Sequence, residues 1–205
     1  MTSRPDVDET GKRGMSREQA LELFRQTGAL VEGHFELRSG LHSDRFFQCA
    51  RVLQEPRHAE RLCRALVQRF REAEPQARVD GVISPALGGL PVGHEVARAL
   101  GTHHIFAEKQ KGRLVLRRGF RIEPGEHYVV AEDVVTRGGR VSETIDIVTS
   151  RGGVVSAVLV LVDRSRGSCA FSQPLFSLVE LAPQVWEPAD CPLCAGKHPL
   201  EHPGS

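Results

Sequence analysis

Apolar positions near the start of the chain change from a helical to a strand-like spacing. From Ser16 onward they fall on one helical face, which predicts a helix that begins there. Gln19 stands where a capping box places its second member. Residues 34–49 then form short strand-like pieces on either side of a Ser-Gly turn, and a helical spacing returns over residues 57–72.

In the rest of the chain, short apolar runs alternate with helical spacings. The runs expected to be strands cover residues 79–84, 103–107, 128–131 and 154–162, and helices are expected up to residue 100 and over residues 140–150. Runs that are apolar at nearly every position suit strands buried on both faces of a parallel sheet. The alternation therefore predicts an α/β fold, in which helices flank a central, mostly parallel sheet.

The composition excludes several classes of protein. Of 205 residues, 40% are hydrophobic and 26% are charged, and 27 basic residues balance 26 acidic ones, whereas a dedicated nucleic-acid binder usually carries a basic excess. No run approaches the roughly 20 apolar residues of a membrane-spanning helix, and the polar N-terminus is unlike a secretory signal. Five widely spread cysteines do not suggest a disulfide framework. We therefore expect a cytoplasmic protein without a membrane or nucleic-acid partner.

The stretch after the expected strand 128–131 carries the most chemistry. Glu132 and Asp133 end this strand, and Gly138 and Gly139 precede the next helix. Glycines let the backbone approach a ligand closely, and the N–H groups at a helix N-terminus bind phosphate. Two carboxylates beside a phosphate would repel it unless they bind hydroxyl groups or a metal ion, so a ribose diol or Mg²⁺ is the expected partner. The alternative is a surface turn in which the acids lie by chance.

This stretch resembles the phosphoribosyl pyrophosphate (PRPP) motif of the type I phosphoribosyltransferases. In that family the acid pair binds the ribose hydroxyls and the turn binds the 5-phosphate. Two positions depart from the pattern, because Arg137 replaces a small residue and Arg140 replaces a serine or threonine; an arginine can itself pair with phosphate. The resemblance implies PRPP binding by Glu132, Asp133, Val134, Val135, Thr136, Arg137, Gly138, Gly139 and Arg140.

Two further segments resemble the orotate phosphoribosyltransferase branch of this family. In residues 35–48 the resemblance places Arg38 near PRPP, and Phe46 and Phe47 near orotate; the alternative for the two rings is the core. Residues 84–93 resemble the pyrophosphate-binding loop, or else form a glycine turn that allows close packing of helix on strand. The resemblance assigns pyrophosphate binding in this loop to Leu87, Gly88 and Gly89.

The basic stretch from residue 106 to residue 120 resembles the mobile loop of that branch. In the family this loop closes over PRPP and reaches the active site of the neighbouring subunit in a homodimer. The resemblance implies that Lys109, Lys111 and Arg113 contact the pyrophosphate, with Lys109 and Asp133 as the catalytic residues. The alternative is a solvated charged loop.

Arg164 closes the long apolar run and discriminates between bases. In the orotate branch an arginine at this place pairs with the carboxylate of orotate, because the planar guanidinium matches a carboxylate with two hydrogen bonds. The resemblance also implies that Thr136 of this chain faces the base. A purine offers no matching carboxylate. The alternatives are a solvated arginine or an ion pair with Asp163.

Together these segments imply transfer of 5-phosphoribosyl from PRPP to orotate, giving orotidine 5′-phosphate and pyrophosphate in UMP biosynthesis. Mg²⁺ would be held mainly by PRPP, without direct protein ligands. Phosphoribosyl transfer to a purine, or a non-catalytic nucleotide sensor on the same fold, remain alternatives. The expected organisation is a disordered tail over 1–14 and one domain over 15–205, with a small hood at 15–55, a core at 56–182 and a tail at 183–205.

The C-terminal tail holds a Cys-x-x-Cys pair. Cys191 and Cys194 form half of a possible zinc site, with His198 and His202 as candidate partners. Our interpretation is instead a reduced pair in a turn, because the spacing of these four residues is not that of known four-ligand sites.

Overall fold

The computed structural model describes residues 14–37, 39–169 and 171–203. The predicted disorder of the N-terminal tail and the role of Arg38 therefore concern residues outside these ranges, except for Gly14. The first helix, α1 (Arg17–Gln26), begins as predicted. Ser16 Oγ accepts from Gln19 N at 3.1 Å, and Ser16 N donates to Gln19 Oε1 at 2.8 Å, which completes the predicted capping box.

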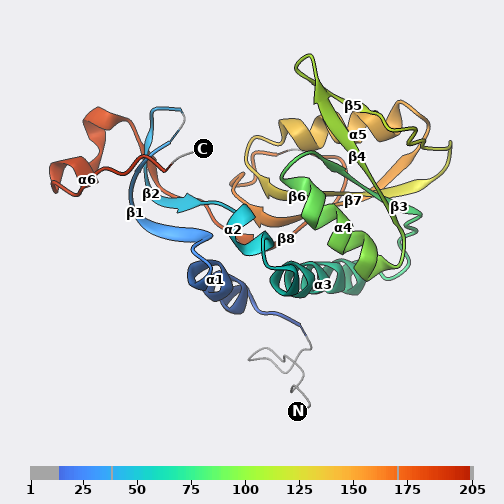
Figure 1. Ribbon diagram of the computed structural model, residues 1–205, viewed down its shortest axis with the longest axis horizontal. Coiled ribbons are helices and arrows are strands. Elements are labelled where there is room, and N and C mark those ends of the chain that lie inside the picture. Colours follow the sequence, from blue (N-terminus) through green and yellow to red (C-terminus); the bar gives the residue numbers. More distant parts are fainter. Residues whose placement is uncertain (1–13, 38, 170, 204–205) are drawn as a thin grey trace, which may run out of the picture.

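A six-stranded sheet forms the centre of the molecule (Figure 1). Five parallel strands are bordered by one antiparallel edge strand, which confirms the predicted α/β fold. In spatial order the strands are β5 (Arg113–Leu116), β4 (His103–Gln110), β3 (Gly81–Pro85), β6 (His127–Val135), β7 (Val154–Asp163) and β8 (Leu175–Glu180).

Helices cover both faces of this sheet (Figure 1). α3 (Pro56–Ala73) and α4 (Gly89–Leu100) pack on one face, and α5 (Gly139–Thr149) packs on the other. Successive residues of a strand point to opposite faces, so Leu159 of β7 joins the first core and Val160 joins the second. Burial on both faces explains why the strands are apolar at nearly every position.

A smaller antiparallel sheet lies beside the central one. It contains β1 (Leu30–Glu36), β2 (His42–Phe47) and β9 (Val185–Trp186). The short helix α2 (Ala50–Leu53) leads from β2 towards α3, and the chain ends with η1 (Pro188–Asp190) and α6 (Pro192–Ala195). The C-terminal tail thus packs against the N-terminal hairpin, as the blue and red ribbons in Figure 1 show.

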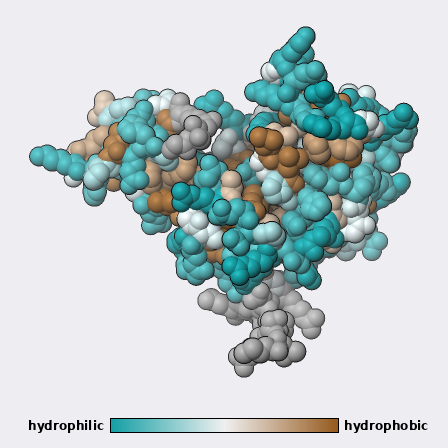
Figure 2. All heavy atoms as spheres, in the orientation of Figure 1, coloured by the Kyte–Doolittle hydropathy of each residue, from teal (hydrophilic) through white to brown (hydrophobic). Residues whose placement is uncertain are grey.

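The surface seen in Figure 2 is mostly hydrophilic. The hairpin formed by β4 and β5 projects from the body of the molecule and is among its most hydrophilic parts. Among the described residues, no helix combines the length and apolar character needed to cross a membrane.

Candidate active site

The carboxyl ends of three adjacent parallel strands meet at one edge of the central sheet. β3 runs into the loop that contains Leu87 and Gly88, β6 ends at Val135, and Arg164 follows β7. The backbone N–H of Arg164 donates to the carbonyl of Val135 at 2.9 Å, which joins two of these ends directly. Ligands of open α/β sheets bind at this edge. The segments that resemble binding motifs therefore converge where the fold predicts a site.

The two acidic residues lie in the last part of β6, near its carboxyl end as the sequence suggested, and the strand continues for two residues beyond them. The side chain of Glu132 is only 3% exposed, and Asp133 is half-buried. A Cβ atom added to Gly88 would lie 3.0 Å from the carboxylate oxygens of Asp133, and one added to Gly89 would lie 3.0 Å from Glu132 Oε1. The two glycines therefore allow the loop after β3 to lie directly against the acid pair.

Glu132 is an unusual carboxylic acid. Its pKa is raised from the ordinary value of 4.5 to about 8, mainly by burial and in part by the neighbouring charge of Asp133. The charge of Arg140 acts in the opposite direction and lowers the pKa. At neutral pH the group is therefore mostly protonated in the folded chain and can donate a hydrogen bond as well as accept one.

Arg140 links the acid pair to the loop after β3. Its Nη2 donates to the carbonyl oxygen of Ala86 at 2.7 Å, and its Nε lies 3.5 Å from Glu132 Oε2. The guanidinium is about half exposed. Because it has five N–H donors in a planar fork, donors remain for an anion after these two contacts are made.

The turn between β6 and α5 forms a concave surface of backbone N–H groups. Gly138 has a φ of +74°, and a Cβ atom there would lie 2.8 Å from a ring carbon of Phe171. Both the backbone conformation and the space favour glycine at this position. Residues 132–141 line a hollow of about 250 Å³. Since α5 begins at Gly139, its first N–H groups face this hollow and suit a phosphate. Thr136 and Arg137 are exposed on the rim.

Arg164 brings a positive charge into the same edge. Its Nε is buried and has no hydrogen-bond partner among the described residues. Burial lowers the pKa of its guanidinium, and the neighbouring Cys49 acts in the opposite direction. Asp163 Oδ1 instead accepts from the backbone N–H of Ser165 at 2.7 Å. Arg164 is thus neither fully solvated nor hydrogen-bonded to Asp163 among the described contacts, and a buried donor without a partner suits a ligand acceptor.

The two phenylalanines of β2 do not form one wall. Adjacent residues of a strand point to opposite faces. Phe47 packs edge-on against Phe24, with ring centroids 4.9 Å apart, whereas Phe46 lies 5.9 Å from Phe35. Phe47 also packs against the core below the small sheet. Only one ring of the pair can therefore face a base in this conformation.

The basic stretch forms a β-hairpin, where the sequence suggested a loop. Lys109 and Arg113 lie in β4 and β5, and Lys111 in the turn has a φ of 48°. The hairpin projects from the sheet (Figure 1). Its base is held by Arg118, whose guanidinium donates to both carboxylate oxygens of Glu108 at 3.0 and 2.8 Å.

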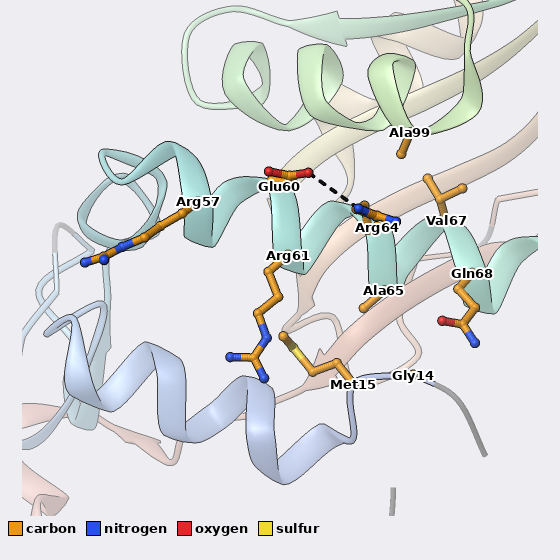
Figure 3. Close-up of a pocket in the computed structure, with 10 residues that line it drawn as sticks. All are labelled: Gly14, Met15, Arg57, Glu60, Arg61, Arg64, Ala65, Val67, Gln68 and Ala99. Carbon is orange, nitrogen blue, oxygen red and sulfur yellow. Dashed lines mark ion pairs between the residues drawn. The ribbon is translucent and has the colours of Figure 1, made fainter. Parts of the chain in front are cut away.

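A larger hollow, of about 630 Å³, lies on the outer side of α3 (Figure 3). Arg57, Arg61 and Arg64 of α3 line it, and Arg64 pairs with Glu60 at 3.6 Å. It has no acid pair and no glycine turn at a strand end. Size therefore does not identify the functional site, and the smaller hollow at the carboxyl edge has the chemistry.

Comparisons with known proteins agree with this geometry. No family model matches the chain. A protein of Heliobacterium modesticaldum named orotate phosphoribosyltransferase is 50% identical over 191 residues, which cover 93% of this chain and 99% of the relative. The crystal structure of orotate phosphoribosyltransferase from Aeropyrum pernix is 27% identical, with a TM-score of 0.63 over 78% of this chain and 92% of that one. The Mycobacterium tuberculosis orotate phosphoribosyltransferase in complex with Fe(III) dicitrate is 26% identical, with a TM-score of 0.66 over 80% and 96%.

Proposed function

The chain belongs to the orotate phosphoribosyltransferase family, and from this membership we propose that it transfers the 5-phosphoribosyl group of PRPP to orotate. The products are orotidine 5′-phosphate and pyrophosphate, as in the synthesis of UMP. The observation that carries the proposal is the convergence of an acid pair, a glycine turn at a helix N-terminus and a buried arginine at one sheet edge. These groups match a ribose diol, a phosphate and a carboxylate.

The acid pair positions the ribose. Asp133 accepts hydrogen bonds from ribose hydroxyls, and the protonated Glu132 both accepts and donates. Neither group needs to act as a nucleophile, because pyrophosphate leaves as the orotate nitrogen attacks the opposite face of the anomeric carbon. Fixing the sugar between the two substrates supplies the alignment that this displacement needs.

The 5-phosphate lies in the turn of residues 136–140. Backbone N–H groups at the start of α5 donate to it. Arg140 supplies the charge-assisted contact in place of a hydroxyl, since part of its guanidinium stays exposed beside the turn. Arg137, also exposed, adds positive charge at the rim.

The oxygen donors at this edge suit Mg²⁺. The carboxylate of Asp133 is half-buried and borders the loop that contains Gly88. Its negative charge would lie close to a Mg²⁺ ion that is held mainly by the oxygens of PRPP, since Mg²⁺ prefers oxygen ligands such as substrate phosphates. When bound with PRPP, Mg²⁺ neutralises negative charge on the pyrophosphate. The backbone of Leu87, Gly88 and Gly89 borders the same place.

Arg164 selects the base. Its buried, unpartnered Nε matches the carboxylate of orotate, and pairing with that group would satisfy the orphaned donor. Thr136 stands at the mouth of the site, where its hydroxyl can contact the base. Neither adenine nor hypoxanthine offers a carboxylate, so a purine substrate would leave Arg164 buried without a partner.

The hairpin completes the site from a neighbouring copy. Lys109, Lys111 and Arg113 belong to the hairpin of β4 and β5, which projects from the body of the chain (Figure 1). Their charges would stabilise the leaving pyrophosphate once a second subunit brings them over the acid pair. In the homodimer that we propose, each hairpin serves the partner's site.

A panel of bases tests the assignment of the substrate. Purified protein is mixed with PRPP, Mg²⁺ and one base at a time, and pyrophosphate release is measured. Release with orotate and none with adenine or hypoxanthine is expected. Pyrophosphate release with a purine would show that the substrate is that purine and not orotate. Nucleotide binding without pyrophosphate release for any base would favour a sensor.

A further inference from the structure

Four side chains of metal-binding types converge where the C-terminal tail meets the N-terminal hairpin. His34 of β1, His42 of β2, Cys191 and Cys194 each place one ligand atom within 4.8 Å of the others. Three of them are buried and Cys194 is exposed. The active site at the carboxyl edge uses none of the four.

The spacing of these atoms suits a tetrahedral metal site. Cys191 Sγ lies 3.4 Å from His34 Nε2, and Cys194 Sγ lies 3.7 Å from His34 Nε2 and 3.3 Å from His42 Nδ1. Tetrahedral zinc, with bonds of about 2.3 Å to sulfur and about 2.0 Å to nitrogen, separates a sulfur from a nitrogen ligand by about 3.5 Å. The two nitrogens lie 2.9 Å apart and would separate by roughly 0.4 Å to reach the same geometry.

Hydrogen bonds within the cluster do not account for this convergence. His34 Nδ1 lies 3.0 Å from the carbonyl oxygen of His198. A carbonyl only accepts, so Nδ1 carries the proton, and Nε2 of the neutral ring presents one lone pair. That lone pair faces His42 Nδ1 and both cysteine sulfurs. One lone pair serves one donor well, whereas one cation at the centre would satisfy all four atoms.

The surroundings of His34 are also those of a metal ligand. A carbonyl behind the ring is a usual partner of a metal-bound histidine, because it fixes the tautomer and the orientation of the ring. The carbonyl of His198 has this position. The histidines that the sequence suggested as ligands are not part of the cluster, since His198 contributes its backbone and His202 Nδ1 lies 3.1 Å from Glu36 Oε2.

We infer that the chain binds one Zn²⁺ through His34, His42, Cys191 and Cys194. Two thiolates and two imidazoles are a ligand set that zinc prefers. Four protein ligands leave no open position for a substrate, so the ion is structural. On binding, the two thiols become thiolates and release their protons to solvent. Both cysteines are free and lie on one short helical turn, as the sequence suggested, and the inference adds a metal ion to this pair.

The ion would join distant parts of the chain. His34 and Cys191 are 157 residues apart. Without the ion, the contacts between the tail and the hairpin include the pairing of β2 with β9 and a backbone bond of 2.9 Å from Glu36 N to Glu201 O. His34 lies in β1 and His42 in β2, so the turn that contains Ser39 and Gly40 connects the two strands that carry the histidine ligands. Zinc would therefore hold the tail and this hairpin as one unit.

Metal content tests the inference directly. The full chain is expressed with zinc in the medium, dialysed without chelator and analysed by elemental mass spectrometry, with about one zinc per chain expected from a four-ligand site. Cys191→Ser, Cys194→Ser and His42→Ala should each lower the content strongly. Cys63→Ser, His198→Ala and His202→Ala serve as matched controls that should keep it, because their side chains lie outside the cluster.

Cobalt substitution keeps the test informative if a variant fails to fold. Co²⁺ added to zinc-depleted wild-type protein should give the visible absorption of tetrahedral cobalt and a thiolate charge-transfer band, and Zn²⁺ should displace both. Metal-free wild-type protein after zinc supplementation would overturn the inference. So would equal zinc content in the cysteine variants, or a cobalt spectrum without thiolate bands.

Discussion

The Nε of Arg140 lies 3.5 Å from Glu132 Oε2, and the same guanidinium donates to the carbonyl of Ala86. One side chain of the phosphate turn thus spans the acid pair and the loop after β3. Arginine at this position is a departure from the pattern of the family, and the structure gives it a role. It joins two of the segments that we propose bind PRPP, and its charge lowers the pKa of the buried Glu132.

Removal of this arginine should weaken PRPP binding. We expect Arg140→Ala to raise the KM for PRPP roughly 10- to 150-fold, since a charge-assisted hydrogen bond contributes about 1.5–3 kcal/mol, and to change the KM for orotate little. Steady-state kinetics with each substrate varied provides the measurement. Arg151→Ala, just beyond the far end of the same helix, is the matched control. An unchanged KM for PRPP would show that the guanidinium does not contact the phosphate.

Arg164→Ala should weaken the binding of orotate and leave the binding of PRPP nearly unchanged. The loss of a charged hydrogen-bonding partner should raise the KM for orotate by about 10- to 150-fold, while the KM for PRPP stays within a few-fold. Arg166→Ala, two residues further along, removes a guanidinium that donates to the carbonyl of Pro183, and should leave both values near those of the wild type. If the KM values for PRPP and orotate rose together in Arg164→Ala, the residue would support the edge as a whole and would not recognise the carboxylate.

The buried Glu132 should make stability depend on pH. Its pKa is about 8 in the folded chain against an ordinary value of 4.5, so between these values the unfolded chain ionises first and holds fewer protons. The free energy of unfolding should therefore fall as pH rises through this window, by an amount on the order of a few kcal/mol, and level off above it. Glutamine at this position does not titrate.

Urea denaturation of the wild type and Glu132→Gln at several pH values measures this effect. The variant should gain stability relative to the wild type as pH rises from 4.5 to 8. A difference that stays constant, or that changes in the opposite direction, would show that Glu132 is not held in its protonated form. The comparison between two proteins cancels the titration of the other groups.

The hairpin sharing that we propose predicts complementation between two inactive variants. Lys109→Ala removes the charge from the hairpin, and Asp133→Asn alters the acid pair, so each alone should be largely inactive. Mixed dimers would contain one intact site, built from the unaltered hairpin of one chain and the unaltered acid pair of the other, which gives about a quarter of the wild-type sites in an equal mixture. Co-refolding and an activity assay test this. No recovery would mean that each hairpin serves its own chain.

Local patterns predicted most of the fold. The capping box of Ser16 and Gln19 and the runs of β6 and β7 involve neighbours in sequence, and the structure confirms them. The strands β5, β8 and β9 were not predicted, because their short segments become strands only by pairing with distant partners. The sequence also suggested that Phe46 and Phe47 both lie near the base, whereas adjacent residues of a strand point to opposite faces.

In the candidate site, too, the features that are local in sequence were predictable and the contacts between distant segments were not. The acids and the glycine turn lie in one short stretch of sequence, so their association was predictable. The contact of Arg140 with Ala86 depends on β3 lying beside β6, and the four-residue metal cluster depends on the C-terminal tail packing on the N-terminal hairpin. The contact of Arg140 has no spacing signal along the chain. Of the metal cluster only the Cys-x-x-Cys pair has one, because the two histidines come from separate elements.

The loss of orotate absorbance in the presence of PRPP and Mg²⁺ tests the central claim most directly. The account predicts turnover that requires both PRPP and Mg²⁺ and that is lost in the Glu132→Gln, Asp133→Asn double variant, with the fold retained by circular dichroism. Undiminished turnover in the double variant, or binding of PRPP without any consumption of orotate by the wild type, would contradict it.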